Sequence, residues 1–365
     1  MRSLVRTLGV ALSIATMTPA LLVACSSGDT TKPSLTPTPF PTVSENVTWQ
    51  IGDTTVAATV TRPDDKKVHP AIVFVAGSGP TDRDWNSPLL PGTNGSARLL
   101  AEEMAKSGFV TIRYDKRVSG PYAQSNLPLL VGKISMESHL DELQGAVDAL
   151  VARADVDPKK IYIIGNSEGT IHALNYQLTR QPKFAGLILT GAPGRSLADV
   201  TRGQIAQQVA SLANAKEIMA GYDRLMADFM AGKPFAADPA VPEGINTFFQ
   251  GLYSPINLPF TREFFAVDAS PLLSKIEAPT LVMIGKKDIQ VDYLLDGGPL
   301  ETAAKGMSNV TFSYPDNANH VLKNETRPRE ALTGADALTY NASDRVLDPE
   351  ALKTIRDWLA QNGGR

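Results

Sequence analysis

The chain has 365 residues, of which 43% are hydrophobic and 20% are charged. This composition supports a large apolar core and excludes a disordered chain, a collagen-like repeat and a miniprotein held together by disulfides. The formal net charge is −3, so there is no basic excess to neutralise a phosphate backbone, and we expect no nucleic-acid partner. A single cysteine excludes an intramolecular disulfide and a zinc site built from several cysteines.

The first residues of the chain are typical of a targeting segment. Arg2 and Arg6 precede an apolar run over residues 8–23, whose length fits a signal peptide better than a membrane-spanning helix. The run ends in Leu-Val-Ala-Cys, which resembles the lipobox of bacterial lipoproteins and contains the one cysteine of the chain, Cys25. The resemblance implies that residues 1–24 are a lipoprotein signal peptide and that Cys25 is acylated. An ordinary secretory signal with a chance cysteine is the alternative.

Acylation of Cys25 would anchor the protein to an extracytoplasmic face of a bacterial membrane, because two or more acyl chains bind a bilayer firmly. Residues 25–45 are rich in Thr, Ser and Pro and repeat Thr-Pro, which favours extended backbone without a core. We therefore expect this segment to be a tether between the lipid and a folded domain over residues 46–365.

Predicted strands and helices alternate along the folded domain. An alternating pattern over residues 47–61 predicts an antiparallel hairpin. Continuous apolar runs, typical of strands that are buried on both faces, then follow at 71–76, 110–114, 161–165, 186–190, 280–284 and 310–314. Helical spacing of apolar residues is found at 97–107, 136–152, 171–179 and 349–361. The alternation predicts an α/β fold with a mostly parallel sheet flanked by helices.

One connection is much longer than an ordinary crossover between strands. It separates the predicted strands at 186–190 and 280–284 and is rich in apolar and aromatic residues at helical spacing. We expect an inserted helical cap over about residues 195–270. Most of its apolar side chains should pack against one another, and its aromatic part suggests a pocket for an acyl group.

The candidate nucleophile lies where a buried strand runs into a helix. Residues 165–169 read Gly-Asn-Ser-Glu-Gly, which is the pattern Gly-x-Ser-x-Gly with Ser167 at its centre. On such a strand-to-helix turn the serine hydroxyl is exposed beside the N–H groups of the helix N-terminus. Glycines two residues before and two residues after the serine are needed because side chains there would collide with neighbouring backbone.

A serine nucleophile needs a base, and the chain has four histidines. His320 lies in a polar loop after the last predicted strand and is the candidate. His69 precedes the serine at the edge of a buried strand, and His139 is expected to be a solvated or capping residue of a helix. His172 follows Ser167 on the same helix and lies too far round that helix to face the hydroxyl.

The carboxylate that orients the base is expected between the serine and the histidine in the chain. Asp288 follows the predicted strand at 280–284, at the carboxyl edge of the sheet where catalytic groups gather. Asp292 is the rival candidate.

The chain order Ser167, Asp288, His320 resembles that of the α/β-hydrolase superfamily, over about residues 47–361. Two positions, Ala76 and Val118, differ from the usual histidine and glycine of its bacterial serine esterases. These departures concern loop shape, because neither position carries a proton in the reaction. Four stretches are similar to that esterase branch, namely residues 77–84, 113–117, 165–169 and 288–291.

The resemblance implies a carboxylic ester hydrolase that acts on a small acyl substrate through an acyl-enzyme, without a metal or an organic cofactor. It also implies an oxyanion hole made by the backbone N–H groups of Ser78 and Glu168. We expect the Glu168 side chain to interact with the helix dipole, and Asp115 to pair with Arg117. A peptidase, a thioesterase or an amidase would use the same triad, and a lipoprotein that binds a ligand without turnover is the alternative from another class.

Overall fold

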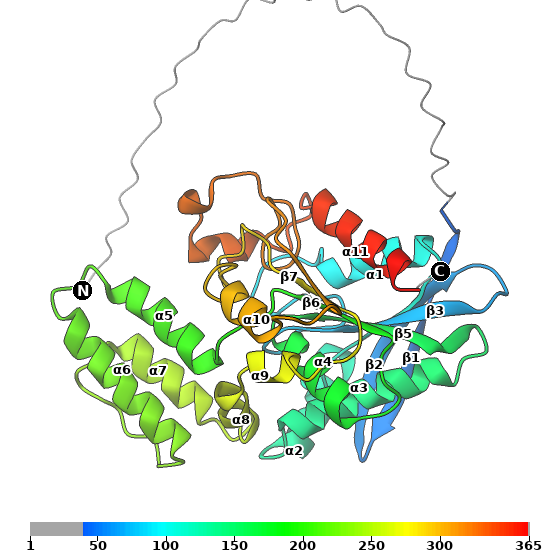
Figure 1. The fold of residues 1–365 in the computed structure, drawn as a ribbon. Helices are drawn as coiled ribbons and strands as arrows, with labels where there is room; N and C mark the ends of the chain where they lie inside the picture. Colours follow the sequence, from blue (N-terminus) through cyan, green and yellow to red (C-terminus); the bar gives the residue numbers. More distant parts are fainter. Residues whose placement is uncertain (1–38, 364–365) are drawn as a thin grey trace, which may run out of the picture. The chain divides into compact units, whose positions relative to one another are not determined.

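The computed structural model describes residues 39–363. The predicted signal peptide, Cys25 and most of the predicted tether lie outside these residues, although the first strand already begins at Thr42. An eight-stranded sheet has the order β1-β2-β4-β3-β5-β6-β7-β8 (Figure 1). Its strands are β1 (Thr42–Ile51), β2 (Thr54–Pro63), β3 (His69–Val75), β4 (Val110–Tyr114), β5 (Val156–Asn166), β6 (Gly186–Thr190), β7 (Thr280–Met283) and β8 (Val310–Ser313).

The sheet is antiparallel at one edge and parallel elsewhere. Strands β1 and β2 form the predicted hairpin, and β2 also pairs antiparallel with β4. All the neighbouring pairs from β4 to β8 are parallel. The predicted α/β fold with a mostly parallel sheet is therefore confirmed, and the carboxyl ends of its parallel strands meet at one edge, where a ligand site is expected.

Helices cover both faces of the sheet (Figure 1). Helices α1 (Ser96–Lys106) and α11 (Pro349–Gln361) pack on one face, and α3 (Met136–Val151) and α4 (Glu168–Thr179) pack on the other. Side chains of strand β3 alternate between the two faces: Phe74 packs in the apolar cluster that includes α1 and α11, and Val75 packs in the cluster that includes α3 and α4. Burial on both faces explains why the central strands are continuous apolar runs, since each fully buried side chain contributes about 1.5–3 kcal/mol.

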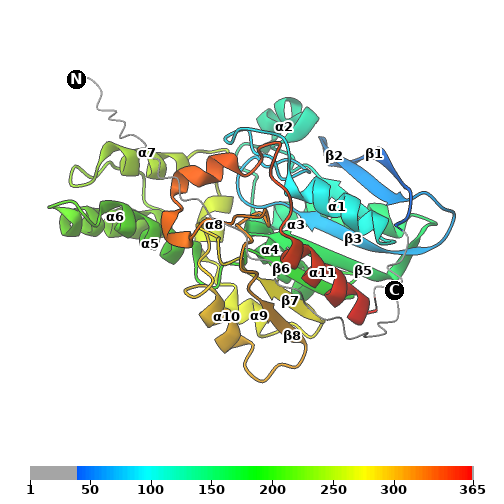
Figure 2. The same cartoon turned by 90° about the horizontal axis from the view of Figure 1, so that it is seen from above.

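The long connection between β6 and β7 forms a group of helices that has its own apolar core, and we call α5–α8 the cap. Its members are α5 (Leu197–Val209), α6 (Ala215–Met230), α7 (Glu243–Leu252) and α8 (Phe260–Ala266). In both views α5, α6 and α7 lie together at one side of the sheet (Figure 1 and Figure 2). Tyr222 of α6 and Phe249 of α7 are fully buried within the cap cluster, with ring centroids 5.4 Å apart.

The remaining α-helices are α2 (Ala123–Leu130), α9 (Ser270–Leu273) and α10 (Gly297–Ala303). Short 3-10 helices lie at Gly120–Tyr122, Arg329–Ala331 and Gly334–Thr339. Helix α2 was not predicted, because it is short and contains Pro128, which is a poor helix former. Within residues 39–363, every helix falls short of the length and apolar character that a membrane crossing requires.

Candidate active site

Ser167 sits on a strained turn between β5 and α4. Its φ of 54° and ψ of −120° lie in a region that residues other than glycine rarely adopt. A Cβ at Gly165 would come within 2.5 Å of the Gly169 carbonyl oxygen, and a Cβ at Gly169 would come equally close to the Val75 carbonyl oxygen. These two close approaches explain why the serine is flanked by glycines. The turn is held by hydrogen bonds at both ends, from the Ser167 N–H to Thr190 and from Thr170 to the Ser167 carbonyl.

His320 and Asp288 are hydrogen-bonded to each other. His320 Nδ1 lies 2.8 Å from Oδ2 of Asp288, and both side chains are buried. The other carboxylate oxygen of Asp288 accepts the backbone N–H groups of Gln290 and Val291, at 2.8 and 2.9 Å. The carboxylate is thus fixed by its own loop while it orients the imidazole. Nearby, Asn166 donates to the His320 carbonyl at 2.9 Å, which links the histidine loop to the turn that carries Ser167.

Asp292, the rival carboxylate, has different partners. Its Oδ2 accepts a hydrogen bond from Arg329 at 2.7 Å, and its Oδ1 accepts the backbone N–H groups of Leu294 and Leu295. These contacts stabilise the loop that carries Asp292. Of the two candidate carboxylates, Asp288 is the one that is hydrogen-bonded to His320.

Ser167 and His320 line one cavity of about 400 Å³. In the described part of the chain, the Ser167 hydroxyl has no hydrogen-bond partner, so the structure brings serine and histidine to the same cavity without a bond between them. In enzymes whose active site contains a serine and a histidine, the hydrogen bond between them often shortens only when a substrate is bound. The cavity is lined by Gly77, Ser78, Thr81, Trp85, Ser87, Leu89, Leu90, Asn166, Ser167, Glu168, Pro193, Leu197, Val200, Gln204, Phe264, Gln290, Val291, His320, Val321, Ala337 and Tyr340.

The two predicted oxyanion donors also border this cavity. A Cβ at Gly77 would lie 3.2 Å from the Ser167 Cβ, so the loop that carries Ser78 runs directly past the serine. Glu168 follows Ser167 as the first residue of α4. Among residues 39–363, no acceptor is found for the backbone N–H of Ser78 or of Glu168. Both donors are therefore available to an oxygen in the cavity.

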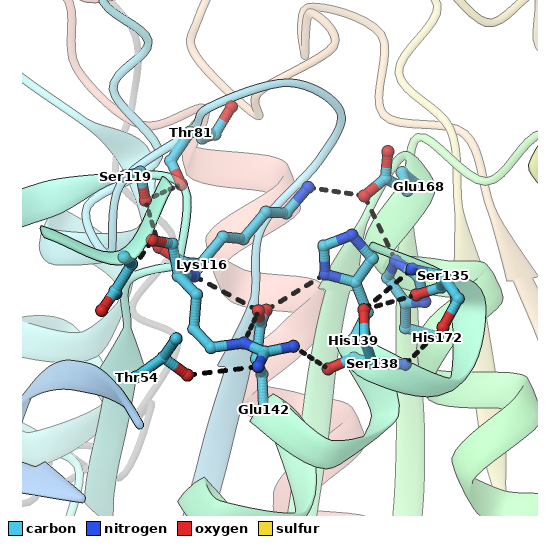
Figure 3. A network of polar contacts seen from close by, with 12 residues as sticks. Thr54, Thr81, Lys116, Ser119, Ser135, Ser138, His139, Glu142, Glu168 and His172 are labelled. Carbon is cyan, nitrogen blue, oxygen red and sulfur yellow. Dashed lines mark hydrogen bonds and ion pairs between the residues drawn. The ribbon is translucent and has the colours of Figure 1, made fainter. Parts of the chain in front are cut away.

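A network of buried charged residues includes Glu168, which directly follows Ser167 in the chain (Figure 3). Lys116 Nζ is 2.5 Å from Oε1 of Glu168, which also lies 3.2 Å from Nε2 of His172. Next to them, Glu142 contacts His139 Nδ1 at 3.0 Å and Arg117 Nε at 2.9 Å. All of these side chains are buried. The structure thus places two ion pairs close together, linked by the neighbouring rings of His139 and His172, and Glu168 of the first pair lines the cavity.

Their burial and mutual charge shift the pKa values of these groups. Burial alone would raise the pKa of Glu168, but the neighbouring Lys116 ammonium, followed by His172, holds it well below the usual value. For Glu142, the same competition between burial and the adjacent His139 and Arg117 brings the pKa to about 2. Burial lowers the pKa of His172, which favours the neutral imidazole. Both carboxylates are therefore ionised at neutral pH.

Sequence reasoning missed this network. Glu168 pairs with Lys116 in addition to lying at a helix N-terminus, and Arg117 pairs with Glu142 rather than with Asp115. Asp115 instead accepts from Arg83, and His139, which was expected to be solvated or a cap, is buried. The available signal was the spacing of His139 and Glu142 within the apolar stripe of α3, which places both on the buried side.

The same cluster contains the one set of candidate metal ligands found in the described residues. Donor atoms of His139, Glu168 and His172 lie within 4.8 Å of one another. The Glu168 oxygen, however, is already bound to the ammonium of Lys116, which supplies the positive charge that an ion would bring. A cation at this point would face Lys116 directly, so the donor set does not fit a metal.

Comparisons with known proteins agree with this architecture. The model of the alpha/beta hydrolase family matches residues 72–335. Esterase EstD from Thermotoga maritima is 26% identical over 265 residues, which are 72% of this chain and 57% of that protein, so the chain spans little more than half of that relative. A solved hypothetical protein from Pseudomonas aeruginosa is 17% identical with a TM-score of 0.51, over 88% of this chain and 94% of the other.

A solved esterase from Thermogutta terrifontis is 19% identical with a TM-score of 0.48, over 87% of this chain and 99% of the other. The family model itself covers well over half of the residues, from the first parallel strands to the loop beyond the histidine. The chain belongs to the alpha/beta hydrolase family.

Proposed function

We propose that the protein is a serine hydrolase that cleaves carboxylic esters with Ser167, His320 and Asp288. The proposal is carried by one observation: a histidine that is hydrogen-bonded to a buried carboxylate lines the same cavity as a serine on a strained strand-to-helix turn. A fixed imidazole and a serine that line the same cavity form the arrangement that nucleophilic acyl transfer needs.

In the proposed reaction, Asp288 holds the proton on Nδ1 of His320 and leaves Nε2 free to accept. The Ser167 oxygen attacks the ester carbonyl carbon while Nε2 takes the serine proton. The carbon–oxygen bond to the alcohol then breaks, and the imidazolium returns its proton to the departing alcohol. A water molecule activated by the same nitrogen hydrolyses the acyl-enzyme, which releases the acid and restores Ser167.

Negative charge develops on the carbonyl oxygen in both steps. The backbone N–H groups of Ser78 and Glu168 are the proposed donors to that oxygen, because both border the cavity and lack acceptors within the described chain. The loss of one such donor typically costs about 3–4 kcal/mol of transition-state stabilisation.

The cavity favours a neutral substrate with an apolar acyl part. Its described lining includes no lysine or arginine, and its one acidic side chain, Glu168, is engaged by Lys116. Leu197, Val200 and Phe264 contribute apolar surface from the cap. A substrate with a free carboxylate would find no cation in this lining, so esters of uncharged acids fit best.

A fluorophosphonate probe and a substrate panel test the proposal. The probe should label the wild-type protein and fail to label Ser167→Ala, which should also lose hydrolysis of p-nitrophenyl esters. Full activity of Ser167→Ala, or no labelling of the wild type, would refute the serine mechanism. Esters, thioesters and aminoacyl amides of one acyl group should then be compared, and a preference for thioesters or amides would replace the ester assignment.

We further propose that the protein is a lipoprotein, anchored by acylated Cys25 to an extracytoplasmic membrane face of a bacterium. The support is the lipobox-like sequence Leu-Val-Ala-Cys, which contains the single cysteine of the chain. In bacterial cells fed with a radiolabelled fatty acid, the wild type should carry label and be extracted with detergent. Cys25→Ser should carry none, and label on this variant would refute the assignment.

A further inference from the structure

We propose that Lys116 is a positioning residue that holds the two oxyanion donors, the N–H groups of Ser78 and Glu168, at a fixed separation. The proposal rests on the proposed serine mechanism and adds a residue that touches neither the substrate nor the reacting atoms. Its basis is the set of acceptors that surround the Lys116 ammonium, which is buried between the Ser78 loop and α4.

The ammonium of Lys116 has three acceptors, which match its three N–H donors. Nζ donates to the carbonyl oxygen of Gly77 at 2.7 Å, to that of Gly79 at 3.4 Å and to Oε1 of Glu168 at 2.5 Å. Two of these acceptors belong to one side of the oxyanion site and the third belongs to the other. One side chain therefore connects both sides.

The contact with Gly77 acts on the oxyanion donor through a single peptide bond. The Gly77 carbonyl and the Ser78 N–H belong to one planar peptide unit, in which the two groups point in opposite directions. Holding the Gly77 oxygen thus fixes the direction of the Ser78 N–H. A positive charge at the carbonyl oxygen also polarises the peptide unit and strengthens its N–H as a donor.

The contact with Glu168 acts on the second donor. Glu168 is the first residue of α4, so its backbone N–H points out of the helix N-terminus and its side chain reaches Lys116. This ion pair is 5% exposed at the lysine and 1% at the glutamate, so solvent screens it little. A rigid pair at this place holds the first residue of the helix against the Ser78 loop.

The residues on either side of Lys116 hold the backbone of its loop in place. Asp115 accepts the backbone N–H of Arg83 at 2.8 Å and the Arg83 guanidinium at 2.6 Å. Ser119 donates to the carbonyls of both Thr81 and Lys116, each at 3.0 Å. The stretch 77–84 therefore interlocks with residues 113–117 and with Ser119 just beyond them. This interlocking gives a physical reason for two motifs, 77–84 and 113–117, that contribute no group to the proton transfers.

The variant Lys116→Met tests the proposal, with Arg117→Met as its matched control. Arg117 is the next residue, is equally buried and is paired with Glu142, but it contacts neither oxyanion peptide. Relative to wild type, Lys116→Met should lower kcat for a p-nitrophenyl ester about 10- to 100-fold, with a smaller change in KM. Arg117→Met also leaves a buried carboxylate unpaired, so it should lower the melting temperature comparably, and it should change kcat by less than about threefold.

Binding of a trifluoromethyl ketone gives a second readout, because its adduct with serine places an oxyanion in the hole. Its inhibition constant should rise in Lys116→Met in proportion to the loss of kcat. A loss of kcat without weaker inhibition, or an equal loss in Arg117→Met, would overturn the proposal. If Lys116→Met does not fold, Lys116→Gln, which is shorter and carries no charge, should be measured in its place, with the same readouts and the same expected direction.

Adding Glu168→Gln to Lys116→Met distinguishes two causes of a lower kcat. One is the loss of positioning of the oxyanion donors, and the other is repulsion of the oxyanion by the unpaired Glu168 carboxylate. In Lys116→Met alone, the unpaired Glu168 charge would disfavour a developing oxyanion nearby. In the double variant Lys116→Met, Glu168→Gln this charge is gone, yet the Gly77 carbonyl still lacks its donor. We expect kcat of the double variant to stay within about threefold of Lys116→Met. Recovery to the wild-type kcat would refute the positioning role, whereas failure of fluorophosphonate labelling in the wild type would instead refute the serine mechanism.

Discussion

Gly285, in the loop after β7, lies against Ala318 in the loop after β8, so closely that a Cβ at Gly285 would meet the Ala318 carbonyl oxygen at 2.0 Å. The same carbonyl accepts the backbone N–H of Lys287 at 3.1 Å. The loop after β7 carries Asp288 and the loop after β8 carries His320. The close contact between the loops therefore sets the distance between the Asp288 carboxylate and the His320 imidazole.

Replacing Gly285 by alanine should therefore separate the two loops. We expect a loss of about 1–3 kcal/mol in the free energy of unfolding, from overpacking against the Ala318 backbone. The loss of kcat should be about 100-fold, because a shift near 1 Å misaligns the catalytic groups. Urea unfolding and ester hydrolysis measure the two effects. Gly298→Ala is the control, because Gly298 lies in a helix with open space around it. This variant should keep the wild-type kcat and should not lower the free energy of unfolding. A Gly285→Ala variant with wild-type kcat would contradict the expectation.

Asp288→Asn should lower kcat by about 10³- to 10⁴-fold, because an amide can present its N–H to His320 and stabilise the wrong tautomer. The protein should remain folded, since Asn can still accept the backbone N–H groups of Gln290 and Val291. Asp292→Asn, four residues along the same loop, loses a half-buried pair with Arg329 and should keep kcat within about threefold of wild type. If the two variants were equally impaired, the assignment of the orienting carboxylate to Asp288 would fail.

The protein should lose stability as the pH falls below about 6.5, and His172 should contribute to this loss. Burial, followed by repulsion from His139, lowers the pKa of His172 in the folded protein. The unfolded chain, with its ordinary pKa near 6.5, then binds a proton that the folded protein rejects, so acid favours unfolding. This one group contributes a slope of at most about 1.4 kcal/mol per pH unit.

His172→Gln should retain a hydrogen bond to Glu168 and remove this titration. Urea unfolding between pH 7.5 and 5 should then show a shallower decline for the variant than for wild type, whatever their stabilities at pH 7.5. At lower pH, Glu142 adds a second loss in both proteins, because its folded pKa of about 2 lies below that of the unfolded chain. Identical slopes between pH 6.5 and 5 would exclude a role for His172.

Phe249→Ala should destabilise the cap more than the sheet. Phe249 is fully buried in the cap cluster and packs against Tyr222 and Phe248. Removal of a buried phenylalanine side chain typically costs about 3–5 kcal/mol. Hydrogen exchange should accelerate in α6 and α7 and stay slow in β5 and α4, while KM for an ester should rise more than kcat falls. Uniform acceleration across the sheet would mean that the cap does not open separately.

The sheet could be predicted from the sequence because its signals are local. Each strand that is covered on both faces is a short apolar run, and Gly-x-Ser-x-Gly places Ser167 at a strand end without knowledge of distant contacts. Elimination among four histidines, chain order and the position of each residue after a predicted strand selected Asp288 and His320 as candidates. The structure joins them by a hydrogen bond, while their roles in catalysis stay predictions.

The buried network could not be predicted in the same way. Lys116 and Glu168 are 52 residues apart in the chain, and the sequence contains many other pairs of opposite charge at such separations. Which of them meet is decided by how α3, α4 and the turn after β4 pack together. Asp115 and Arg117 are two residues apart, and this proximity alone suggested that they pair. In the structure Asp115 pairs with Arg83, and Arg117 pairs with Glu142.

The separate apolar core of the cap has an evolutionary consequence. Leu197, Val200 and Gln204 of α5 shape the cavity, yet most of the cap helices are stabilised by their own cluster rather than by the sheet that carries Ser167. Substitutions in these helices can therefore accumulate at little risk to the positions of Ser167, His320 and Asp288. Related proteins can therefore diverge in substrate preference through their caps while they keep the same reaction.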